Sequence, residues 1–207
     1  MIRRIIPVFS LFSILLASSA LALEEPEFDV LAETGNYEVR RYLPYLVAEV
    51  DVAGDAADNQ AFRMLAGYIF GDNDAGEKMQ MTAPVESRAN AEDSAATYAF
   101  VMEGKYTLAT LPSPNDQRVR LLERPARTVA VRKFSGRWTE ANVARNEARL
   151  LSDLRENGVR TVGDVELARY NSPFTPWFMR RNEIIVPIEW SEAGGQLNVA
   201  AQPGPGL

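Results

Sequence analysis

Residues 76–85 read Gly-Glu-Lys-Met-Gln-Met-Thr-Ala-Pro-Val, and the rest of the chain can be organised around them. Polar and apolar side chains alternate from Lys78 to Ala83, which is the period of a strand with one apolar face. Pro84 cannot donate a hydrogen bond to a neighbouring strand, so we expect this strand to lie at a sheet edge or to end there. Its two methionines would form an adaptable apolar surface that suits either a core or a ligand. A further alternating segment, residues 97–103, predicts the next strand.

Two strand-like segments and a helix precede this stretch. Residues 37–43 and 45–52 have the composition of strands and are separated by Pro44. A helix follows, with Asp58 predicted as its N-cap and Gly71 as its end. Its apolar residues recur at the i, i+3, i+4 and i+7 spacing of an amphipathic helix: Phe62, Leu65, Ala66 and Ile69.

A second unit with the same order of elements begins near residue 118. It has two strands about Pro125, as the first unit has about Pro44, and a longer helix that ends at Gly158. The predicted strands of this unit are residues 119–123, 126–133, 164–170 and 183–188, and the predicted helix is residues 138–157. The chain therefore predicts a tandem strand–helix–strand–strand repeat.

The two units, about residues 37–104 and 118–190, each contain an amphipathic helix that must bury its apolar stripe. They should therefore combine into one mostly antiparallel sheet with both helices packed on it, a fold of the α+β class. The 207 residues suffice for one such domain. Residues 23–36 are acidic and without a period, so we expect an extended lead-in; residues 191–207 are rich in Gly, Ala, Gln and Pro, so we expect a disordered tail.

Residues 1–22 have the organisation of a cleavable secretory signal. Arg3 and Arg4 precede an apolar run, and Ala20-Leu21-Ala22 has the small-x-small form of a cleavage site. The alternative is an uncleaved membrane anchor, but the run is short for a bilayer span of about 20 residues. We therefore expect a periplasmic or secreted protein whose mature chain begins near residue 23.

Composition excludes several classes of function. The chain has no cysteine and no histidine, which excludes disulfides, thiolate catalysis, Cys- or His-ligated zinc, a Ser-His-Asp triad and a His-ligated haem. Its net charge is −6, and loss of the two signal arginines would make it about −8. This acidic balance argues against nucleic acid and anionic lipid headgroups as partners. Phosphate-binding loops and nucleotide fingerprints are also absent from the sequence.

Six short motifs occur in a fixed order along residues 37–187. They are Tyr37-Glu38-Val39-Arg40-Arg41-Tyr42, Tyr68-Ile69-Phe70-Gly71-Asp72-Asn73, the stretch at 76–85, Phe134-Ser135-Gly136, Asn171-Ser172-Pro173-Phe174 and Arg180-Arg181-Asn182-Glu183-Ile184. Together they resemble the SOUL haem-binding protein family. The resemblance implies a pseudo-two-fold, distorted antiparallel barrel of about eight strands with two helices, akin to bacterial effector-binding domains. It also implies that the ligand is haem or another porphyrin.

The resemblance implies a site as well. In tetrapyrrole-binding relatives the ligand rests against the first helix and the turn before the last strand, mostly through apolar contacts. Carried over, these positions are Phe62, Met64, Leu65, Gly67, Tyr68, Met179 and Arg180. Arg180 and Arg181 could hold the propionates through forked hydrogen bonds, or one of them could instead pair with Glu183. Core packing is the alternative role for Phe62 and Leu65, and gap filling is the alternative to iron contact for Met79 and Met81.

The predicted function is therefore that of an exported, monomeric tetrapyrrole-binding protein that uses hydrophobic contacts and arginine–propionate pairing, with a ligand that is not needed for folding. Contact with a membrane would come only from an uncleaved signal segment. One alternative is a small hydrolase-like enzyme on the same scaffold with a pocket glutamate, and another is a protein-interaction module of the envelope. No spacing selects a catalytic group, and the candidates are Glu77, Glu86, Glu103, Tyr68 and Tyr98.

Overall fold

The computed structural model describes residues 23–54, 57–89 and 95–190, so the predictions for the secretory signal and the tail lie outside the described residues. The strands are β1 Phe28–Glu33, β2 Glu38–Tyr42, β3 Tyr45–Ala53, β4 Val85–Ala89, β5 Ala95–Val101, β6 Arg120–Arg124, β7 Arg127–Phe134, β8 Glu166–Arg169 and β9 Asn182–Pro187. The helices are α1 Ala57–Ile69, α2 Glu140–Glu156 and the short 3₁₀ helix η1 Trp177–Met179. In this part of the chain, no helix is long and apolar enough to cross a membrane.

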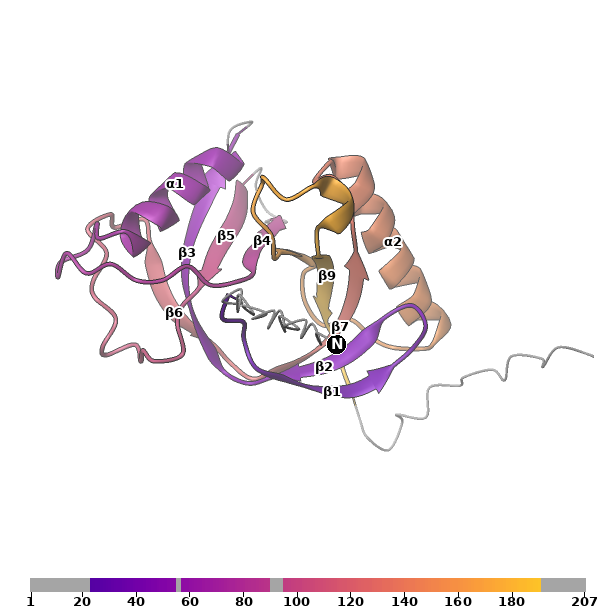
Figure 1. The fold of residues 1–207 in the computed structure, drawn as a ribbon. Helices are drawn as coiled ribbons and strands as arrows, with labels where there is room; N and C mark the ends of the chain where they lie inside the picture. The colour runs from indigo at the N-terminus through magenta and orange to yellow at the C-terminus, as the bar shows by residue number, and fades with distance from the viewer. Residues whose placement is uncertain (1–22, 55–56, 90–94, 191–207) are drawn as a thin grey trace, which may run out of the picture.

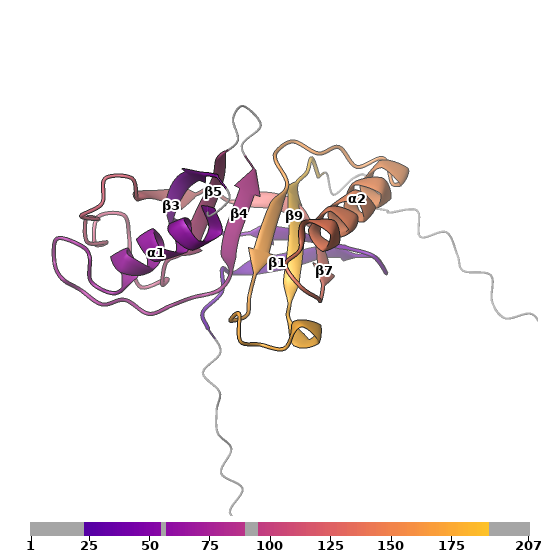
Figure 2. The same ribbon diagram turned by 90° about the horizontal axis from the view of Figure 1, so that it is seen from above.

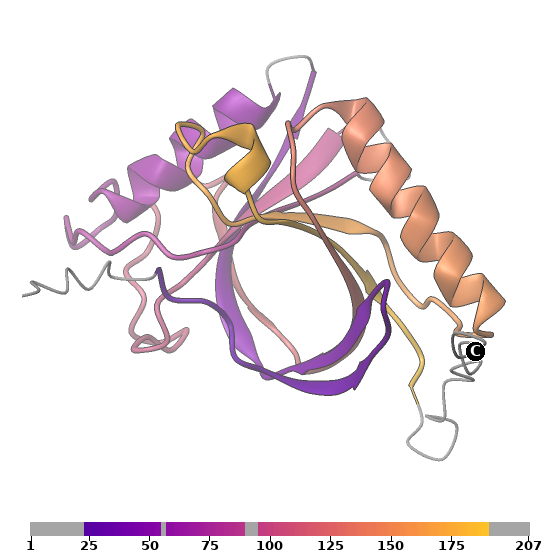
Figure 3. The ribbon, with the colours of Figure 1, turned by 45° about the vertical axis from the view of Figure 1, so that its right-hand side comes forward.

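The strands form one antiparallel sheet in the order β1-β2-β7-β9-β8-β4-β5-β3-β6. Figure 3 shows the strands curving into a ring. Over the described residues, the two edge strands β1 and β6 do not pair with each other, so the ring is an incomplete barrel. Both helices lie outside it, α1 at one side and α2 at the other (Figures 1 and 2). The predicted α+β class, with a distorted antiparallel barrel and two helices, is confirmed.

The strand order is symmetric about the β4–β8 pair. Strands β2, β3, β4 and β5 of the first unit correspond in chain order to β6, β7, β8 and β9 of the second. If each strand is replaced by its counterpart, the order from β2 to β6 becomes the same order read in the opposite direction. The arrangement of strands is therefore that of a pseudo-two-fold barrel, while the tandem repeat of the sequence itself stays a prediction.

Each helix buries one outer patch of the sheet. Beneath α1, every second residue of β3 and β5 packs against the helix, in a core that includes Ala48, Val50, Phe100, Leu65 and Ile69. Beneath α2, a second core includes Leu150, Leu154, Ala130, Ile184 and Val186. Because side chains alternate along a strand, the intervening residues of these strands face the interior of the ring.

The stretch at residues 76–85 is not the strand that its alternation predicts. Its backbone runs to irregular partners: the Met79 N–H donates to the Ile69 carbonyl at 2.8 Å, and the Gln80 N–H donates to Glu103 Oε1 at 2.9 Å. The strand β4 begins only at Val85, and it lies in the middle of the sheet between β5 and β8 rather than at an edge. Ladder pairing starts after Pro84 because proline has no N–H to offer a neighbouring strand.

The predicted lead-in at residues 23–36 contains a strand. Residues Phe28–Glu33 form β1 and pair with β2, with a bulge between Val30 and Ala32. This strand raises the number of strands in the described residues from the expected eight to nine. Its side chains are all half-buried or exposed, so no apolar alternation marked it in the sequence.

The two helices depart from prediction at their first turns. Asp58 is not an N-cap, because α1 already begins at Ala57 and Asp58 lies in its first turn. The N-cap of α2 is Thr139, whose hydroxyl oxygen accepts a hydrogen bond from the Asn142 N–H. The predicted end of α2 at Gly158 is confirmed: this glycine follows the C-cap with φ of +67°, a conformation that favours glycine.

Candidate functional site

A groove on the outer surface of the sheet separates α1 from the loop between β8 and β9. It encloses about 320 Å³ and is named here the aromatic groove. Its lining residues are Asp58, Asn59, Phe62, Val85, Tyr98, Phe100, Trp138, Arg169, Asn171 and Pro173. They come from α1, three central strands and two loops, so the groove exists only when the two halves of the barrel meet.

Four aromatic side chains form the walls of this groove. Phe62 packs edge-on against Phe100 with their ring centroids 5.5 Å apart, and Phe62 is 47% exposed. Trp138 lies just before the N-cap of α2, where its indole N–H donates to Asn182 Oδ1 at 2.6 Å. This hydrogen bond to a fully buried asparagine fixes the orientation of the indole ring. The walls are therefore apolar surfaces held in place before any ligand arrives.

Two arginines lie over the Trp138 ring. The guanidinium carbon of Arg180 is 4.3 Å from the ring centroid, and that of Arg169 is 5.4 Å away. Arg169 also pairs with Asp58 at 3.1 Å, which links β8 to the first turn of α1. One rim of the groove therefore has cationic groups next to an aromatic surface.

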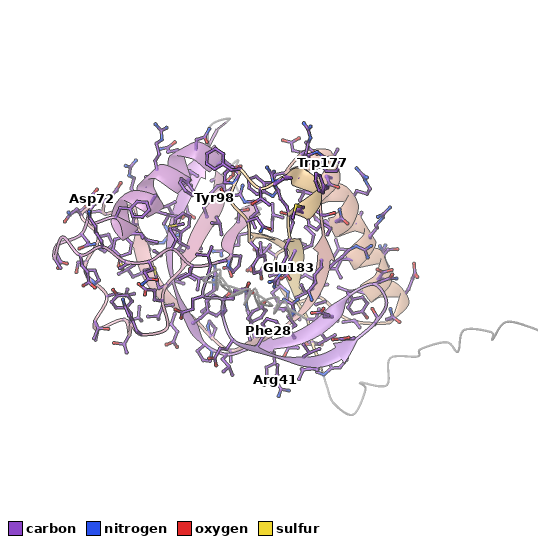
Figure 4. The ribbon with its side chains drawn as sticks, viewed as in Figure 1. Phe28, Arg41, Asp72, Tyr98, Trp177 and Glu183 are labelled. Carbon is purple, nitrogen blue, oxygen red and sulfur yellow. The ribbon has the colours of Figure 1, made fainter. Side chains whose placement is uncertain are left out.

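Tyr98 lines the aromatic groove and lies between α1 and the loop that carries Trp177 (Figure 4). Burial, with the nearby Asp58 carboxylate, raises its pKa to about 12, so the phenol is neutral at physiological pH. The same tyrosine lines a second hollow of about 400 Å³ toward α2, which also includes Ser87, Val143, Glu147, Leu167 and Ile184. The outer surface between the two helices is thus hollowed on both sides of Tyr98.

The structure separates the residues that were predicted for the site on α1. Phe62 lines the aromatic groove, whereas Leu65 and Tyr68 are buried in the first core, where the Tyr68 hydroxyl donates to the Pro112 carbonyl. Met64 packs half-buried against the same core, and Gly67 faces Asp72. Core packing is therefore the role of Leu65. The helical spacing suggested the same role for Phe62, but Phe62 is not a core residue.

Arg180 and Arg181 diverge although they are neighbours in sequence. Arg180 turns outward to Trp138 and donates hydrogen bonds to the Thr175 and Pro173 carbonyls. Arg181 turns toward the barrel, where it pairs with Glu183 and Glu25, each at 3.0 Å. Of the two arginines, Arg181 therefore forms the ion pair with Glu183 that was the alternative to propionate binding. Met179 is largely exposed on the outer side of the loop.

Sequence reasoning did not assign Trp138 or Arg169 to the site, and it considered Tyr98 only as a catalytic group. A signal was present for Trp138, which follows the Phe134-Ser135-Gly136 motif by two residues. Arg169 could be placed only after pairing, because its register opposite Val85 sets it on the outer surface.

The interior of the barrel holds charged side chains that are paired with one another, next to a third apolar cluster that includes Val131. Arg40 and Glu183 are both fully buried, and their Nη1 and Oε2 atoms are 2.9 Å apart. The hydroxyl of Tyr170 donates to the same Glu183 oxygen, and Arg40 donates to the hydroxyl of Tyr42. The Glu183 carboxylate thus has several donors, the condition under which a buried charge is tolerated. Figure 4 shows Glu183 within the ring.

A second interior cluster contains the candidate catalytic residue Glu86. Burial, with the adjacent Glu166 carboxylate, raises the pKa of Glu86, and the Tyr45 hydroxyl donates to it at 2.8 Å. Burial alone would also raise the pKa of Glu166, but hydrogen bonds from Arg127 at 2.7 Å lower it. The void beside Glu86 has no room for a water-sized molecule. A sealed carboxyl of this kind has no access to a substrate.

The remaining polar and sulfur candidates have structural contacts. The Glu77 carboxylate accepts from the Tyr106 hydroxyl, and Glu103 pairs with Lys105 in addition to accepting from Gln80. Met79 is buried in the first core and Met81 packs half-buried against it, which fits the gap-filling alternative. Among the described residues, no group of three or more acidic side chains is placed to hold a metal ion.

A larger hollow of about 460 Å³ lies beside the segment that precedes β1. It has five glutamates in its lining: Glu24, Glu25, Glu27, Glu103 and Glu123. Such a lining would repel an anionic ligand. The aromatic groove, although smaller, therefore fits a flat, apolar and anionic molecule better.

The model of the SOUL heme-binding protein family matches residues 23–187. The chain is 30% identical to human Heme-binding protein 2 over 191 residues, covering 80% of this chain and 90% of that protein. It is 29% identical to the mouse Heme-binding protein 2 over 181 residues, covering 78% and 88% of the two chains. A crystal structure described as a hydrolase from Listeria innocua has the same fold, with a TM-score of 0.58, 14% identity and coverage of 77% and 94%. On the sequence match over most of its length, this chain belongs to the SOUL heme-binding protein family.

Proposed function

We propose that this protein binds haem or another porphyrin in the aromatic groove. The observation that supports it is the combination in one groove of exposed aromatic surface, from Phe62 and Trp138, with arginines at the rim. A porphyrin is a flat apolar ring with two carboxylates, so this lining matches both parts of the ligand. The relatives named Heme-binding protein 2 support the same ligand class.

Binding would come from contact with the faces of the macrocycle rather than from an iron ligand. The chain has no histidine or cysteine to donate to iron. Burial of apolar surface contributes about 25 cal/mol per Å², enough for micromolar affinity after the loss of translational freedom. Since the groove of about 320 Å³ is shallow for a porphyrin, one edge of the ring would remain in solvent.

Arg180 is the arginine we assign to the propionates. It stacks on Trp138 at the rim, so its guanidinium could exchange a carbonyl partner for a carboxylate. Arg181 is engaged by Glu183 and Glu25 and has less to offer. The Arg180→Ala change should therefore weaken haem and porphyrin binding alike, and Arg181→Ala should leave both affinities within about twofold.

Titration of the purified mature protein with ferric haem and with metal-free protoporphyrin, side by side, tests the proposal. We expect the two dissociation constants to agree within about tenfold, a difference of about 1.4 kcal/mol. A sharp low-spin haem spectrum with a far weaker metal-free ligand would reveal an iron ligand and contradict this mode of binding. Absence of binding of either compound at micromolar concentration would remove the proposed function.

We also propose that the protein acts outside the cytoplasm. The support is the sequence pattern of residues 1–22, with two arginines, an apolar run and the Ala20-Leu21-Ala22 motif. Intact-mass analysis of protein purified from its native source should give a chain that starts at or near Leu23. A mass that retains Met1 would favour the uncleaved anchor.

A further inference from the structure

The loop between β8 and β9 presents a group of exposed apolar side chains. Phe174 is 96% exposed, Trp177 50%, Phe178 61% and Met179 65%. These are four of the eleven large exposed apolar side chains of the described residues, and they fall within one seven-residue segment, residues 173–179. This segment, named here the apolar tip, lies at the rim of the molecule, where Figure 4 labels Trp177. A cluster of this kind indicates an interaction surface.

The shape of the apolar tip is fixed by its own hydrogen bonds. The Arg180 guanidinium donates to the Thr175 and Pro173 carbonyls at 2.9 and 2.6 Å. The Met179 N–H donates to the Pro176 carbonyl, and the Gly136 N–H donates to the Trp177 carbonyl, which ties the tip to the loop after β7. Its apolar side chains are thus held outward on a braced loop, so little ordering remains to be done when they bind.

The loops at the apolar tip carry positive charges, although Arg181 is paired with Glu25 and Glu183. Residues 171–181 and 134–139, the two loops that meet there, contain Arg137, Arg180 and Arg181 and no acidic residue, although the whole chain has a net charge of −6. Arg137 is exposed. Exposed aromatic side chains next to Arg137 and Arg180 have the composition of a segment that enters a lipid headgroup region.

We propose that the apolar tip inserts into the surface of a phospholipid bilayer. Phe174, Trp177 and Phe178 would enter the boundary between headgroups and acyl chains, and Arg137 would lie at the depth of the phosphates. The expected surface is zwitterionic, because the acidic remainder of the protein would be repelled by an anionic membrane. A protruding tip favours this partner over a protein groove, since it needs no complementary pocket.

Insertion would also set the aromatic groove next to the membrane. Pro173 belongs both to the apolar tip and to the lining of the groove, so the groove mouth would open close to the lipid surface. A flat apolar ligand could then pass between bilayer and groove without crossing much water. This consequence rests on the proposed function, whereas the insertion itself does not.

Flotation of the mature chain with phosphatidylcholine vesicles tests the insertion. We expect the wild type to float with the vesicles, and the Phe174→Ser/Phe178→Ser double variant to lose at least about tenfold in partition coefficient. The control is Phe70→Ser, which removes a phenylalanine beyond the end of α1 that is about as exposed as Phe178, and it should bind within about twofold of wild type. Absence of wild-type flotation, or equal flotation of the double variant, would overturn the proposal.

Bromine-labelled lipids provide a second readout that does not depend on a loss of binding. Quenching of tryptophan fluorescence should occur in the wild type and should be weaker in Trp177→Phe, because Trp177 would lie deeper in the bilayer than Trp138, which lines the groove. Quenching that is as strong in Trp177→Phe as in the wild type would place another surface at the membrane and overturn the proposal. Porphyrin titration without lipid is independent of both assays, so failure of the proposed function and failure of insertion can be told apart.

Discussion

The two surfaces of the curled sheet differ in where they place charged and aromatic side chains. The inner surface holds Arg40 and Glu183, which are fully buried and paired, whereas the outer surface between the helices holds Phe62 and Trp138 in an open groove. The barrel is narrow enough for its own side chains to fill it, as barrels of about eight strands usually are. This filling supports the proposed ligand site outside the barrel, where the helices leave the sheet uncovered.

The same comparison separates stability from binding. Each interior charge is satisfied only by its neighbours, so removal of one member leaves another charge buried without a partner. The groove side chains are partly exposed, so their removal changes the surface offered to a ligand more than it changes the core. Substitutions on the two surfaces should therefore have opposite profiles, with a loss of stability inside and a loss of affinity outside.

The largest expected effect is at the interior ion pair. Glu183→Ala should lower the free energy of unfolding by about 3–5 kcal/mol, because Arg40 would stay buried without its main partner. The control is Asp116→Ala, which breaks an exposed pair with Arg118 and should cost less than about 1 kcal/mol. Urea denaturation of both variants measures the difference. Equal, small losses would show that the interior charges are solvated.

Two residues less than one turn apart on α1, one buried and one exposed, should differ in their contribution to stability. Leu65→Ala should lower the free energy of unfolding by about 2–5 kcal/mol, because Leu65 is fully buried. Phe62→Ala should lower it clearly less, since Phe62 is 47% exposed on the groove side. Thermal and urea unfolding provide the measurement. A larger loss for Phe62→Ala would mean that the groove wall is part of the core.

The converse effect is expected for affinity. Phe62→Ala should weaken porphyrin binding about tenfold, about 1.4 kcal/mol, since it removes one wall of the groove. Phe70→Ala is the control, because this phenylalanine is also exposed, 57% against 47% for Phe62, but does not line the groove. Dissociation constants from absorbance titration decide the matter. Equal affinities of wild type and Phe62→Ala would place the ligand elsewhere.

The smallest expected effects concern pH and the two interior carboxyls. The pKa of Glu86 is raised in the folded protein, so the unfolded chain loses this proton at a lower pH. The contribution of Glu86 to stability therefore falls as the pH rises above 4.5, the ordinary pKa of a glutamate. Glu86→Gln should remove this decline.

The pKa of Glu166 is lowered in the folded protein, so its contribution to stability is present above the ordinary pKa of 4.5. This contribution is lost as the pH falls through the lowered pKa of the folded state. Glu166→Gln should therefore reduce stability at neutral pH and flatten the acid limb.

Urea denaturation from well below pH 4 up to pH 8 checks both signs, with the wild type measured in the same buffers. The two variants should change the slope of stability against pH in opposite directions. The interior hydrogen bonds indicate that the two carboxyls have different buried environments. Slopes that change in the same direction would contradict this difference.

Local patterns in the sequence were sufficient for much of the fold. The prolines at 44 and 125 mark the breaks between β2 and β3 and between β6 and β7, and the stripes with Leu65 and Leu154 mark the buried faces of the two helices. These features depend on neighbours within a few residues, so their periods can be read directly. Six ordered motifs were likewise sufficient for the family.

Only the tertiary structure decided which surface each side chain joins. Alternation along β2 places Arg40 on the polar face of the strand, which a sequence pattern assigns to the solvent. Curling of the sheet instead turns that face into the sealed interior. The divergence of Arg180 and Arg181, and the meeting of Phe62, Trp138 and Arg169, depend on pairings between residues that are far apart in sequence. The stretch at residues 76–85 shows the same limit, because its partners at Ile69 and Glu103 satisfy its backbone without a ladder. Periodicity is a local property of the chain, whereas the identity of a facing partner is fixed only when the whole sheet has closed.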